Sequence, residues 1–383
     1  MCPSAPDILR PVNTSTPAEG LRVIWLSHSE TPGLHPDPGL LRHHRSAGRR
    51  LRVGIPAAWL QSAGVEQWLL SPPADDGLAQ ALALKPDLVM VSGLHPNVDG
   101  LEDGRGYFDC IHAFRRAGVR IVVDFGENHF QDARAPAFRE TIELSDALII
   151  TTQSLADIIE EKTGRTSIVI ADPVEGARRE PAFNPPPQRS LLKRLLKRLL
   201  KRAQPRPLKL LWFGGQGRNY FYLKALIPQL QAFACETPLE FTLVTGPIEG
   251  IDADIDAWNR ASPAFQARLE YWSPSVLEQA MAACDAVIIP SDVAARMAAS
   301  ANRMTESLWA GRFVVAHGLP SYWEFRESAW IGEDLIAGLR WALAHPDEAV
   351  ARIARGQDII AARHTPEVIG PLWGEAFAKL AGR

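Results

Sequence analysis

The sequence predicts an α/β protein with two doubly wound parallel sheets, each in its own domain. Its 383 residues correspond to two or three domains at about 150 residues each, and 46% of them are hydrophobic, enough for a core in each domain. Short β-branched and aliphatic runs alternate with amphipathic stretches of helical length, which is typical of parallel strands connected by helices. This composition excludes a disordered or fibrous chain.

The first half contains the expected strands of one sheet. They cover residues 21–26, 66–70, 87–92, 119–124, 146–151 and 167–171. Helices are expected between them, for example over 107–117 and 153–162, with Ser154 as the cap of the latter.

The second half repeats this pattern. Strands are expected at 208–213, 240–245, 268–272, 286–290 and 312–316, and helices at 220–235, 275–283, 300–310 and 333–345. A proline-rich stretch after Ile170 cannot continue either kind of element, so we expect one domain over 1–175, a linker over 176–206 and a second domain over 207–362. Because ligands bind beyond the carboxyl ends of parallel strands, the active site is expected in a cleft between the domains.

Several classes of protein are disfavoured by composition. The start of the chain has neither a basic nor an apolar region of a secretory signal, and no apolar run approaches the roughly 18 residues that cross a bilayer. The four cysteines have no CxxC spacing, which argues against zinc or disulfide frameworks. We therefore expect a cytoplasmic protein without a metal; the Asp-Ala-Asp at 252–254 is interpreted as surface.

Charge is concentrated in one short segment. Residues 189–206 hold eight Lys or Arg and no acid, and removing these eight from the net charge of −3 leaves −11 for the rest. An acidic body with one basic stripe is unlike a nucleic-acid-binding surface, so no nucleic-acid partner is expected.

The repeat Leu-Leu-basic-basic in this segment predicts an amphipathic helix. Such a helix can lie flat on an anionic membrane, and this places the protein peripherally on the inner face of the plasma membrane. The expected membrane contacts are Lys193, Arg194, Lys197, Arg198, Lys201, Arg202, Leu195 and Leu199. A linker helix docking its leucines on a domain is the alternative.

Two stretches of the second half resemble a known family. SANRMTESLWAGRFVVA (300–316) has a basic residue three positions before a glutamate on a helix, then Ala-Gly and a buried strand, and WFGGQG (212–217) is a glycine-rich turn between strand and helix. Together with the two-domain pattern, they resemble the retaining, group 1 branch of GT-B nucleotide-sugar glycosyltransferases. The resemblance implies two Rossmann-like domains facing across a cleft, with a C-terminal helix over 363–383 crossing back to the first domain.

The resemblance also implies a donor site for a nucleoside-diphosphate sugar, which is a co-substrate, with no separate cofactor. Glu306 would accept the ribose hydroxyls, and cations with a helix N-terminus would bind the diphosphate. The implied donor-binding residues are Gly214, Gly215, Gly217, Arg218, Lys224, Arg303 and Glu306. The alternatives are a surface Arg-x-x-Glu pair and a simple tight turn.

Polar residues after strands of the first half are the expected acceptor-side groups. His95, Asp124 and Glu127 follow or end two strands and are the catalytic candidates, since a carboxylate or imidazole there can orient sugar hydroxyls or act as a base. Helix capping or water binding is an equally simple role for each of them.

One position departs from the family pattern. The family has two glutamates eight positions apart, and the position eight before Glu306 is Ala298. The expected function is sugar transfer to a glycan or lipid-linked acceptor in cell-surface polysaccharide or glycolipid synthesis. The alternatives are a catalytically silent GT-B protein that binds a nucleotide sugar or scaffolds a biosynthetic complex, and a GT-B epimerase. Ala298 leaves the retaining or inverting outcome open.

Overall fold

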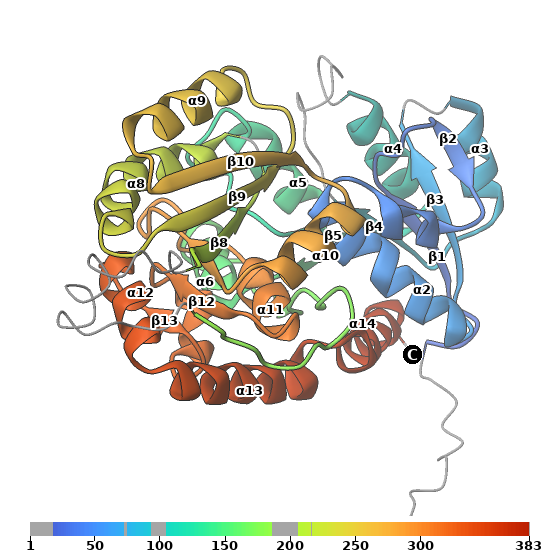
Figure 1. Ribbon diagram of the computed structural model, residues 1–383. Helices are drawn as coiled ribbons and strands as arrows, with labels where there is room; N and C mark the ends of the chain where they lie inside the picture. Colours follow the sequence, from blue (N-terminus) through green and yellow to red (C-terminus); the bar gives the residue numbers. More distant parts are fainter. Residues whose placement is uncertain (1–17, 73–74, 93–104, 186–205, 216, 383) are drawn as a thin grey trace, which may run out of the picture.

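Two mostly parallel sheets, each covered by helices, confirm the predicted fold class (Figure 1). The computed structural model describes residues 18–72, 75–92, 105–185, 206–215 and 217–382 of the chain. The blue and green elements form the N-terminal sheet with its helices, and the yellow to red elements, apart from the last helix, form the C-terminal sheet with its helices. Residues 189–205 of the basic segment and His95 lie outside the described residues.

The strands of the N-terminal sheet run in the order β2-β3-β1-β4-β5-β6-β7. Their bounds are β1 (Arg22–Leu26), β2 (Gly33–His35), β3 (Glu66–Ser71), β4 (Leu88–Ser92), β5 (Arg120–Phe125), β6 (Ala147–Ile150) and β7 (Ile168–Val169). All paired strands are parallel except β2, which is antiparallel to β3. The pattern did not predict β2, because it is three residues long and lies within a loop rich in Pro, Gly, His and Arg.

Helices cover both faces of this sheet. They are α1 (Ala47–Arg49), α2 (Ile55–Ser62), α3 (Asp75–Ala83), α4 (Arg105–Arg116), α5 (Ala135–Leu144) and α6 (Gln153–Thr163). All of β4 is buried, and alternate residues serve opposite faces: Val89 and Val91 belong to one apolar cluster, Leu88 and Met90 to another. The expectation that Ser154 caps α6 was wrong. Thr152 is the cap, and its hydroxyl accepts a hydrogen bond from the Leu155 N–H.

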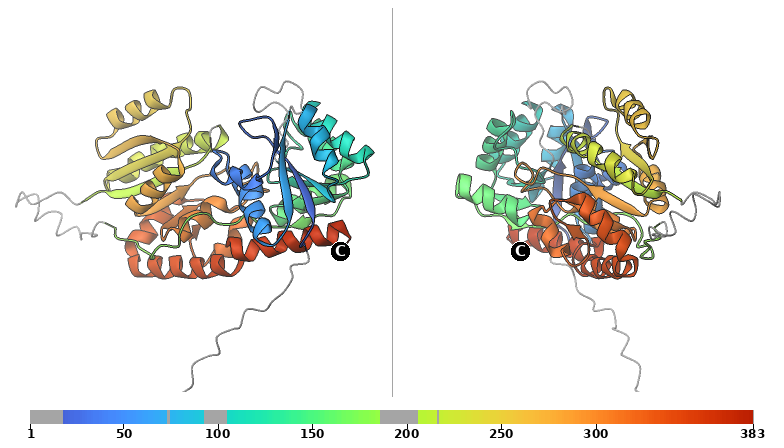
Figure 2. Two further views of the ribbon diagram at one scale, coloured as in Figure 1. Left: turned by 90° about the vertical axis from the view of Figure 1, so that its right-hand side faces the viewer. Right: turned by 60° about the vertical axis from the view of Figure 1, so that its left-hand side comes forward.

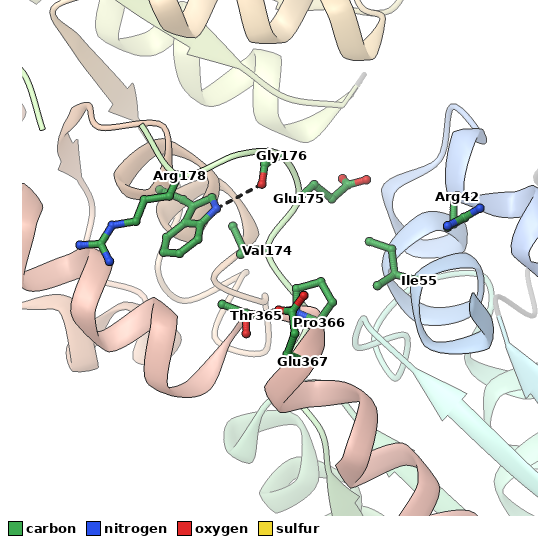
Figure 3. A pocket seen from close by; sticks show the side chains of 10 residues that line it. Arg42, Ile55, Val174, Glu175, Gly176, Arg178, Thr365, Pro366 and Glu367 are labelled. Carbon is green, nitrogen blue, oxygen red and sulfur yellow. Dashed lines mark hydrogen bonds between the residues drawn. The ribbon is translucent and has the colours of Figure 1, made fainter. Parts of the chain in front are cut away.

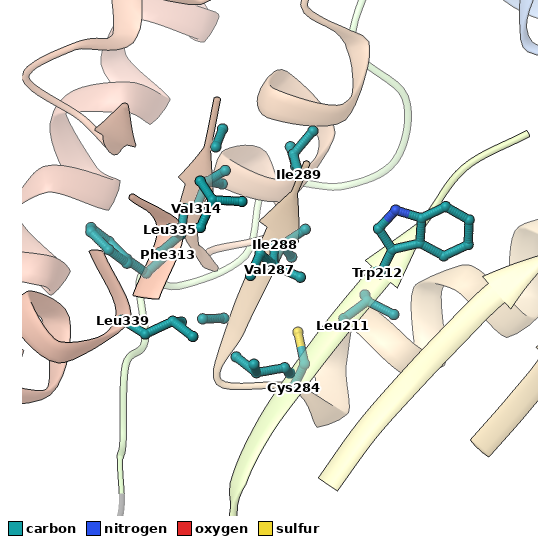
Figure 4. Packing of buried hydrophobic residues seen from close by; sticks show 14 of the residues in the cluster. Leu211, Trp212, Cys284, Val287, Ile288, Ile289, Phe313, Val314, Leu335 and Leu339 are labelled. Carbon is teal, nitrogen blue, oxygen red and sulfur yellow. The ribbon is translucent and has the colours of Figure 1, made fainter. Parts of the chain in front are cut away.

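The strands of the C-terminal sheet run in the order β10-β9-β8-β11-β12-β13. They are β8 (Leu208–Phe213), β9 (Leu239–Thr245), β10 (Phe265–Tyr271), β11 (Ala286–Ile289), β12 (Phe313–Ala316) and β13 (Trp330–Ile331). The helices of this domain are α8 (Arg218–Ala234), α9 (Ile251–Ala261), α10 (Pro274–Ala283), α11 (Asn302–Trp309), α12 (Leu335–Ala344) and α13 (Pro346–Arg363). Strands β8, β11 and β12 and helix α12 share one apolar core. Figure 4 shows one residue of each: Leu211, Val287, Phe313 and Leu339.

A last helix, α14 (Pro366–Ala381), packs on the N-terminal domain. The red helices α13 and α14 run below both domains (Figure 2). Trp373 and Phe377 are fully buried, and both rings contact the ring of Trp25 on β1. The chain is therefore tied across the domain junction twice, once by the linker after β7 and once by α14.

The linker lies along the C-terminal domain before the basic segment. The Arg179 N–H donates to the Trp309 carbonyl, and the Ala182 N–H donates to that of Gly311. Gly311 has a φ of +73°, and a Cβ there would lie 2.2 Å from the Glu180 carbonyl oxygen. Only glycine fits this position, which explains the Ala-Gly pair that follows α11.

Candidate functional site

The glycine-rich turn lies at the carboxyl end of β8, in the C-terminal domain. Gly217 has a φ of +85° and caps α8, whose first N–H groups face the turn. A Cβ on Gly214 would lie 3.5 Å from the Asn219 Cβ and 3.7 Å from Arg303 Nη1. The guanidinium of Arg303 therefore lies against the turn. The side chain of Arg218 lies outside the described set.

Arg303 is the second residue of α11, the helix that follows β11. Its Nη2 lies 3.5 Å from the Ser291 hydroxyl at the end of that strand, and its Nη1 is buried without a hydrogen-bond partner among the described residues. Burial lowers the pKa of Arg303, Arg296 lowers it further, and Tyr322 raises it. A buried cation with an unused donor beside a helix N-terminus has the properties of an anion site.

Glu306 is one helical turn after Arg303. Burial raises the pKa of its carboxyl to about 8; the carboxylates of Glu175 and Asp172 add to this increase, and Arg50 and Arg303 oppose it. Within the described part of the chain, no hydrogen-bond donor or ion-pair partner reaches the Glu306 carboxylate. A half-buried carboxylate without a described donor is suited to accept hydrogen bonds from ligand hydroxyls.

Arg50 joins the N-terminal domain, the linker and the C-terminal domain. Its Nε and Nη2 donate to the two carboxylate oxygens of Glu175 at 2.8 and 2.7 Å. Its guanidinium also lies over the ring of Trp272, which follows β10, with 4.7 Å from Cζ to the ring centroid. Nothing in the sequence pattern pointed to Arg50, Glu175 or Trp272, since each belongs to a different segment.

A pocket of about 350 Å³ opens beside Glu175 (Figure 3). It is lined by Arg42, Ile55, Val174, Glu175, Gly176, Arg178, Trp309, Thr365, Pro366 and Glu367. The Trp309 indole N–H donates to the Gly176 carbonyl at 3.2 Å, as the dashed line shows. A second pocket of about 160 Å³ includes Asp172, Asn302 and Thr305. Both cavities therefore adjoin the carboxylates that surround Glu306.

Asp124, one catalytic candidate, is held in a closed ionic network. Its carboxylate accepts from Arg52 at 2.6 Å and from the Ser92 hydroxyl at 2.9 Å, and it is 2% exposed. Arg52 also donates to Asp172 and to the Ile170 carbonyl. Although burial opposes it, Asp124 and Asp172 raise the pKa of Arg52. Asp124 thus stabilises the segment directly after β7, and its carboxylate is occupied by protein partners.

The other predicted residues lie apart from one another. Glu127 is exposed in the loop after β5. Lys224 lies on the second turn of α8, where its Nζ is 2.8 Å from Asp254 Oδ2. Tyr220 donates to the same carboxylate at 2.6 Å. Because its charge is directed to α9, Lys224 does not join the cluster at the glycine turn.

Ala298, where the resemblance implied a glutamate, is part of the domain interface. It is 5% exposed and packs with the apolar cluster of the N-terminal domain, and its carbonyl accepts a hydrogen bond from Thr152 at 3.1 Å. Among the described residues, no group of His, Cys, Asp and Glu is arranged to hold a metal ion. Within the same residues, no helix combines the length and apolarity that crossing a membrane requires.

Solved structures with the same architecture exist at low sequence identity. HepE from Anabaena, in complex with UDP and glucose, is 14% identical, with a TM-score of 0.56 over 94% of this chain and 99% of that one. An E. coli trehalose-6-phosphate protein, bound with UDP-2-fluoro glucose, is 13% identical, with a TM-score of 0.58 over 94% and 99%. A glycosyltransferase from Rickettsia africae is 8% identical, with a TM-score of 0.60 over 94% and 98%.

These likenesses extend over both domains. No protein-family model matches the sequence, and no curated protein matches it. At such identities the likeness shows the fold, which is the GT-B arrangement of two Rossmann-like domains.

Proposed function

We propose that this protein is a glycosyltransferase that moves a sugar from a nucleoside-diphosphate donor to a glycan or lipid-linked acceptor. The observation that carries the proposal is the pair Arg303 and Glu306. A buried guanidinium with an unused N–H lies one helical turn from a carboxylate without a described partner, at the carboxyl ends of the strands. The UDP ligands of the Anabaena and E. coli structures support a nucleotide donor.

In this proposal the donor's parts have separate binding groups. Glu306 accepts hydrogen bonds from the ribose hydroxyls, which replace the hydration that its carboxylate loses by burial. Arg303 and the N-terminus of α8 stabilise the negative charge that grows on the leaving diphosphate. The bond from the anomeric carbon to the diphosphate oxygen breaks with its electron pair on the diphosphate. The acceptor oxygen forms the new bond and releases its proton to a base, for which exposed Glu127, or His95 outside the described residues, is the candidate.

Binding of nucleoside diphosphates by calorimetry tests the donor site. We expect the wild-type chain to bind at least one of them and to prefer ribose over 2′-deoxyribose. Above pH 8, where the Glu306 carboxyl is ionised, Glu306→Gln should weaken binding about tenfold or more, because hydrogen bonds to a charged group contribute roughly 1.5–3 kcal/mol, and it should reduce the ribose preference. Glu327→Gln, at an exposed glutamate of the same domain, is the matched control. Retention of both affinity and ribose preference in Glu306→Gln would reject the site.

A catalytically silent nucleotide-sugar-binding protein is the second candidate. Ala298 favours it, because this position is buried in the domain interface and has no carboxylate to offer a sugar. A transfer and hydrolysis assay with the nucleotide sugar that binds best separates the two candidates. Turnover supports the enzyme, whereas tight binding without turnover of any acceptor supports the silent protein.

We further propose that the basic segment holds the protein on the inner face of the plasma membrane. The described residues at its two ends lie together, since Arg206 donates to the Asn184 carbonyl and pairs with Asp285 at 2.8 Å. The domain therefore does not need the intervening residues to span a distance, which supports a role for them outside the domain. Six cations at about 1 kcal/mol each would suffice for binding to anionic lipid.

Sedimentation with anionic liposomes tests this membrane proposal. The double substitution Leu195→Glu and Leu199→Glu should leave most of the protein in the supernatant, since it removes apolar burial and adds negative charge. The matched control changes two exposed leucines elsewhere, Leu40→Glu and Leu372→Glu, and should sediment like wild type. Equal sedimentation of both variants and wild type would contradict the proposal.

A further inference from the structure

The connection from β11 to α11 is held by both domains. Asp292 accepts a hydrogen bond from the Ala295 N–H at 3.1 Å, and Ser321 donates to the Ala299 carbonyl at 2.7 Å. On the other side, Thr152 of the N-terminal domain donates to the Ala298 carbonyl at 3.1 Å. These three anchors fix the backbone on both sides of Arg296.

Arg296 reaches from this connection to the first turn of α8. Its Nη1 donates to Asn219 Oδ1 at 3.2 Å, while its Nε is buried without a hydrogen-bond partner in the described part of the chain. Asn219 also lies beside Gly214, against which Arg303 packs. The two guanidiniums therefore approach the glycine turn from two different segments.

Neither arginine forms an ion pair among the described residues. Within the described residues, no carboxylate forms an ion pair with either of them, and the charge of Arg296 lowers the pKa of Arg303 in addition to the effect of burial. Two partly desolvated like charges, each with an unused buried N–H, oppose folding unless a ligand supplies negative charge. A group with two adjacent negative charges and several acceptor oxygens would satisfy both.

We infer that Arg296 is a second diphosphate-binding residue, supplied by the connection before α11 and acting together with Arg303. The inference rests on the proposed function and adds to it the residue that supplies a second positive charge to the diphosphate. The glycine turn contributes backbone N–H groups, and Lys224, a cation on α8 whose side chain the structure describes, is already paired with Asp254. The connection in which Ala298 replaces the family glutamate thus has a different role, which is to bring a cation to the leaving group.

Paired affinity measurements test this role. We would measure binding of the nucleoside diphosphate that wild type binds best, of the corresponding nucleoside, and of inorganic pyrophosphate. Arg296→Gln should weaken nucleoside-diphosphate and pyrophosphate binding about tenfold and leave nucleoside binding unchanged. Arg296→Lys should fall between, because an ammonium group cannot bind Asn219 and an anion with the same planar geometry. Arg326→Gln, an exposed arginine of the same domain, is the matched control.

The outcomes separate this inference from the proposed function. Nucleoside-diphosphate binding by Arg296→Gln that equals the Arg326→Gln control would overturn the inference, while wild-type binding would still support the function. An equal loss for nucleoside and nucleoside diphosphate would show a structural role for Arg296 and would also overturn the inference. No nucleoside-diphosphate binding by the wild-type chain would overturn both. Melting temperatures of the variants establish whether each is folded. If Arg296→Gln does not fold, the same affinities are compared between Arg296→Lys and the control.

Discussion

At the scale of single residues, the candidate site is defined by groups whose polar atoms are incompletely satisfied. Arg303 and Arg296 each have a buried N–H without a described partner, and the Glu306 carboxyl has a raised pKa with no described donor. Elsewhere at the junction the buried charges are paired, as Arg52 is with Asp124 and Arg50 with Glu175. Buried polar groups are usually satisfied in folded proteins, so this contrast distinguishes a ligand site from structural ion pairs.

The raised pKa of Glu306 predicts a pH-dependent contribution to stability. Between its ordinary value of 4.5 and about 8, the folded protein holds a proton that the unfolded chain releases. This contribution is therefore fully present below pH 4.5 and is lost as the pH rises through about 8. Without ligand, the melting temperature of wild type relative to Glu306→Gln should fall steadily from pH 5 to pH 8.

Glu175, Asp172, Arg50 and Arg303 face this carboxyl and are unchanged in the variant, so the difference isolates Glu306. Glu327→Gln is again the control. Melting curves for wild type and Glu306→Gln that shift in parallel with pH would show that the Glu306 carboxyl is not perturbed.

At the scale of elements, the contact between α14 and α2 attaches the C-terminal helix to the N-terminal domain. Gly370 faces Trp59 so closely that a Cβ there would lie 2.2 Å from the Trp59 Cγ. A Cβ on Gly374, one turn later, would lie 3.3 Å from the outer edge of the same ring. The first position requires glycine because of packing, whereas the second has nearly enough room for a methyl group.

This difference predicts opposite effects of the same substitution. Gly370→Ala should reduce the free energy of unfolding by about 1–3 kcal/mol, because overpacking forces Trp59 to move. Gly374→Ala should be neutral or slightly stabilising, because alanine favours the helix by roughly 1 kcal/mol over glycine. Urea denaturation monitored by tryptophan fluorescence measures both. Equal stabilities for the two variants would show that Trp59 does not limit the approach of α14.

At the scale of the whole molecule, the domains are held together by contacts that surround the candidate site. Arg50 stacks on Trp272 from the opposite domain, and Thr152 binds the Ala298 carbonyl. Both contacts involve segments next to Glu306 or Arg296. The contacts that hold the two domains together and the candidate site are therefore coupled in space, which the proposed sugar transfer requires because water must be excluded from the activated sugar.

The elements that the sequence predicted are those with a long or regular signal. The buried runs of β4 and β11 and the amphipathic helices were found close to their observed bounds, whereas β2 and β13, at three and two residues, were not. In the site, the sequence predicted that Arg303 and Glu306 lie on one face of a helix, because residues three positions apart are separated by about one helical turn. Arg296 could have been noticed as a cation after β11, but nothing local related it to Asn219, 77 positions away.

The sequence by itself determined the two-sheet fold and the neighbourhood of Arg303, Glu306 and the glycine turn, because hydrophobic period and helical spacing are local properties of the chain. Only the tertiary structure decided which charges are already paired. Asp124 is matched by Arg52 from 72 positions away, Lys224 by Asp254, and Arg296 is matched by no described acid. Ion pairing and desolvation depend on atoms within a few ångströms, and in this fold those atoms come from distant segments and from both domains.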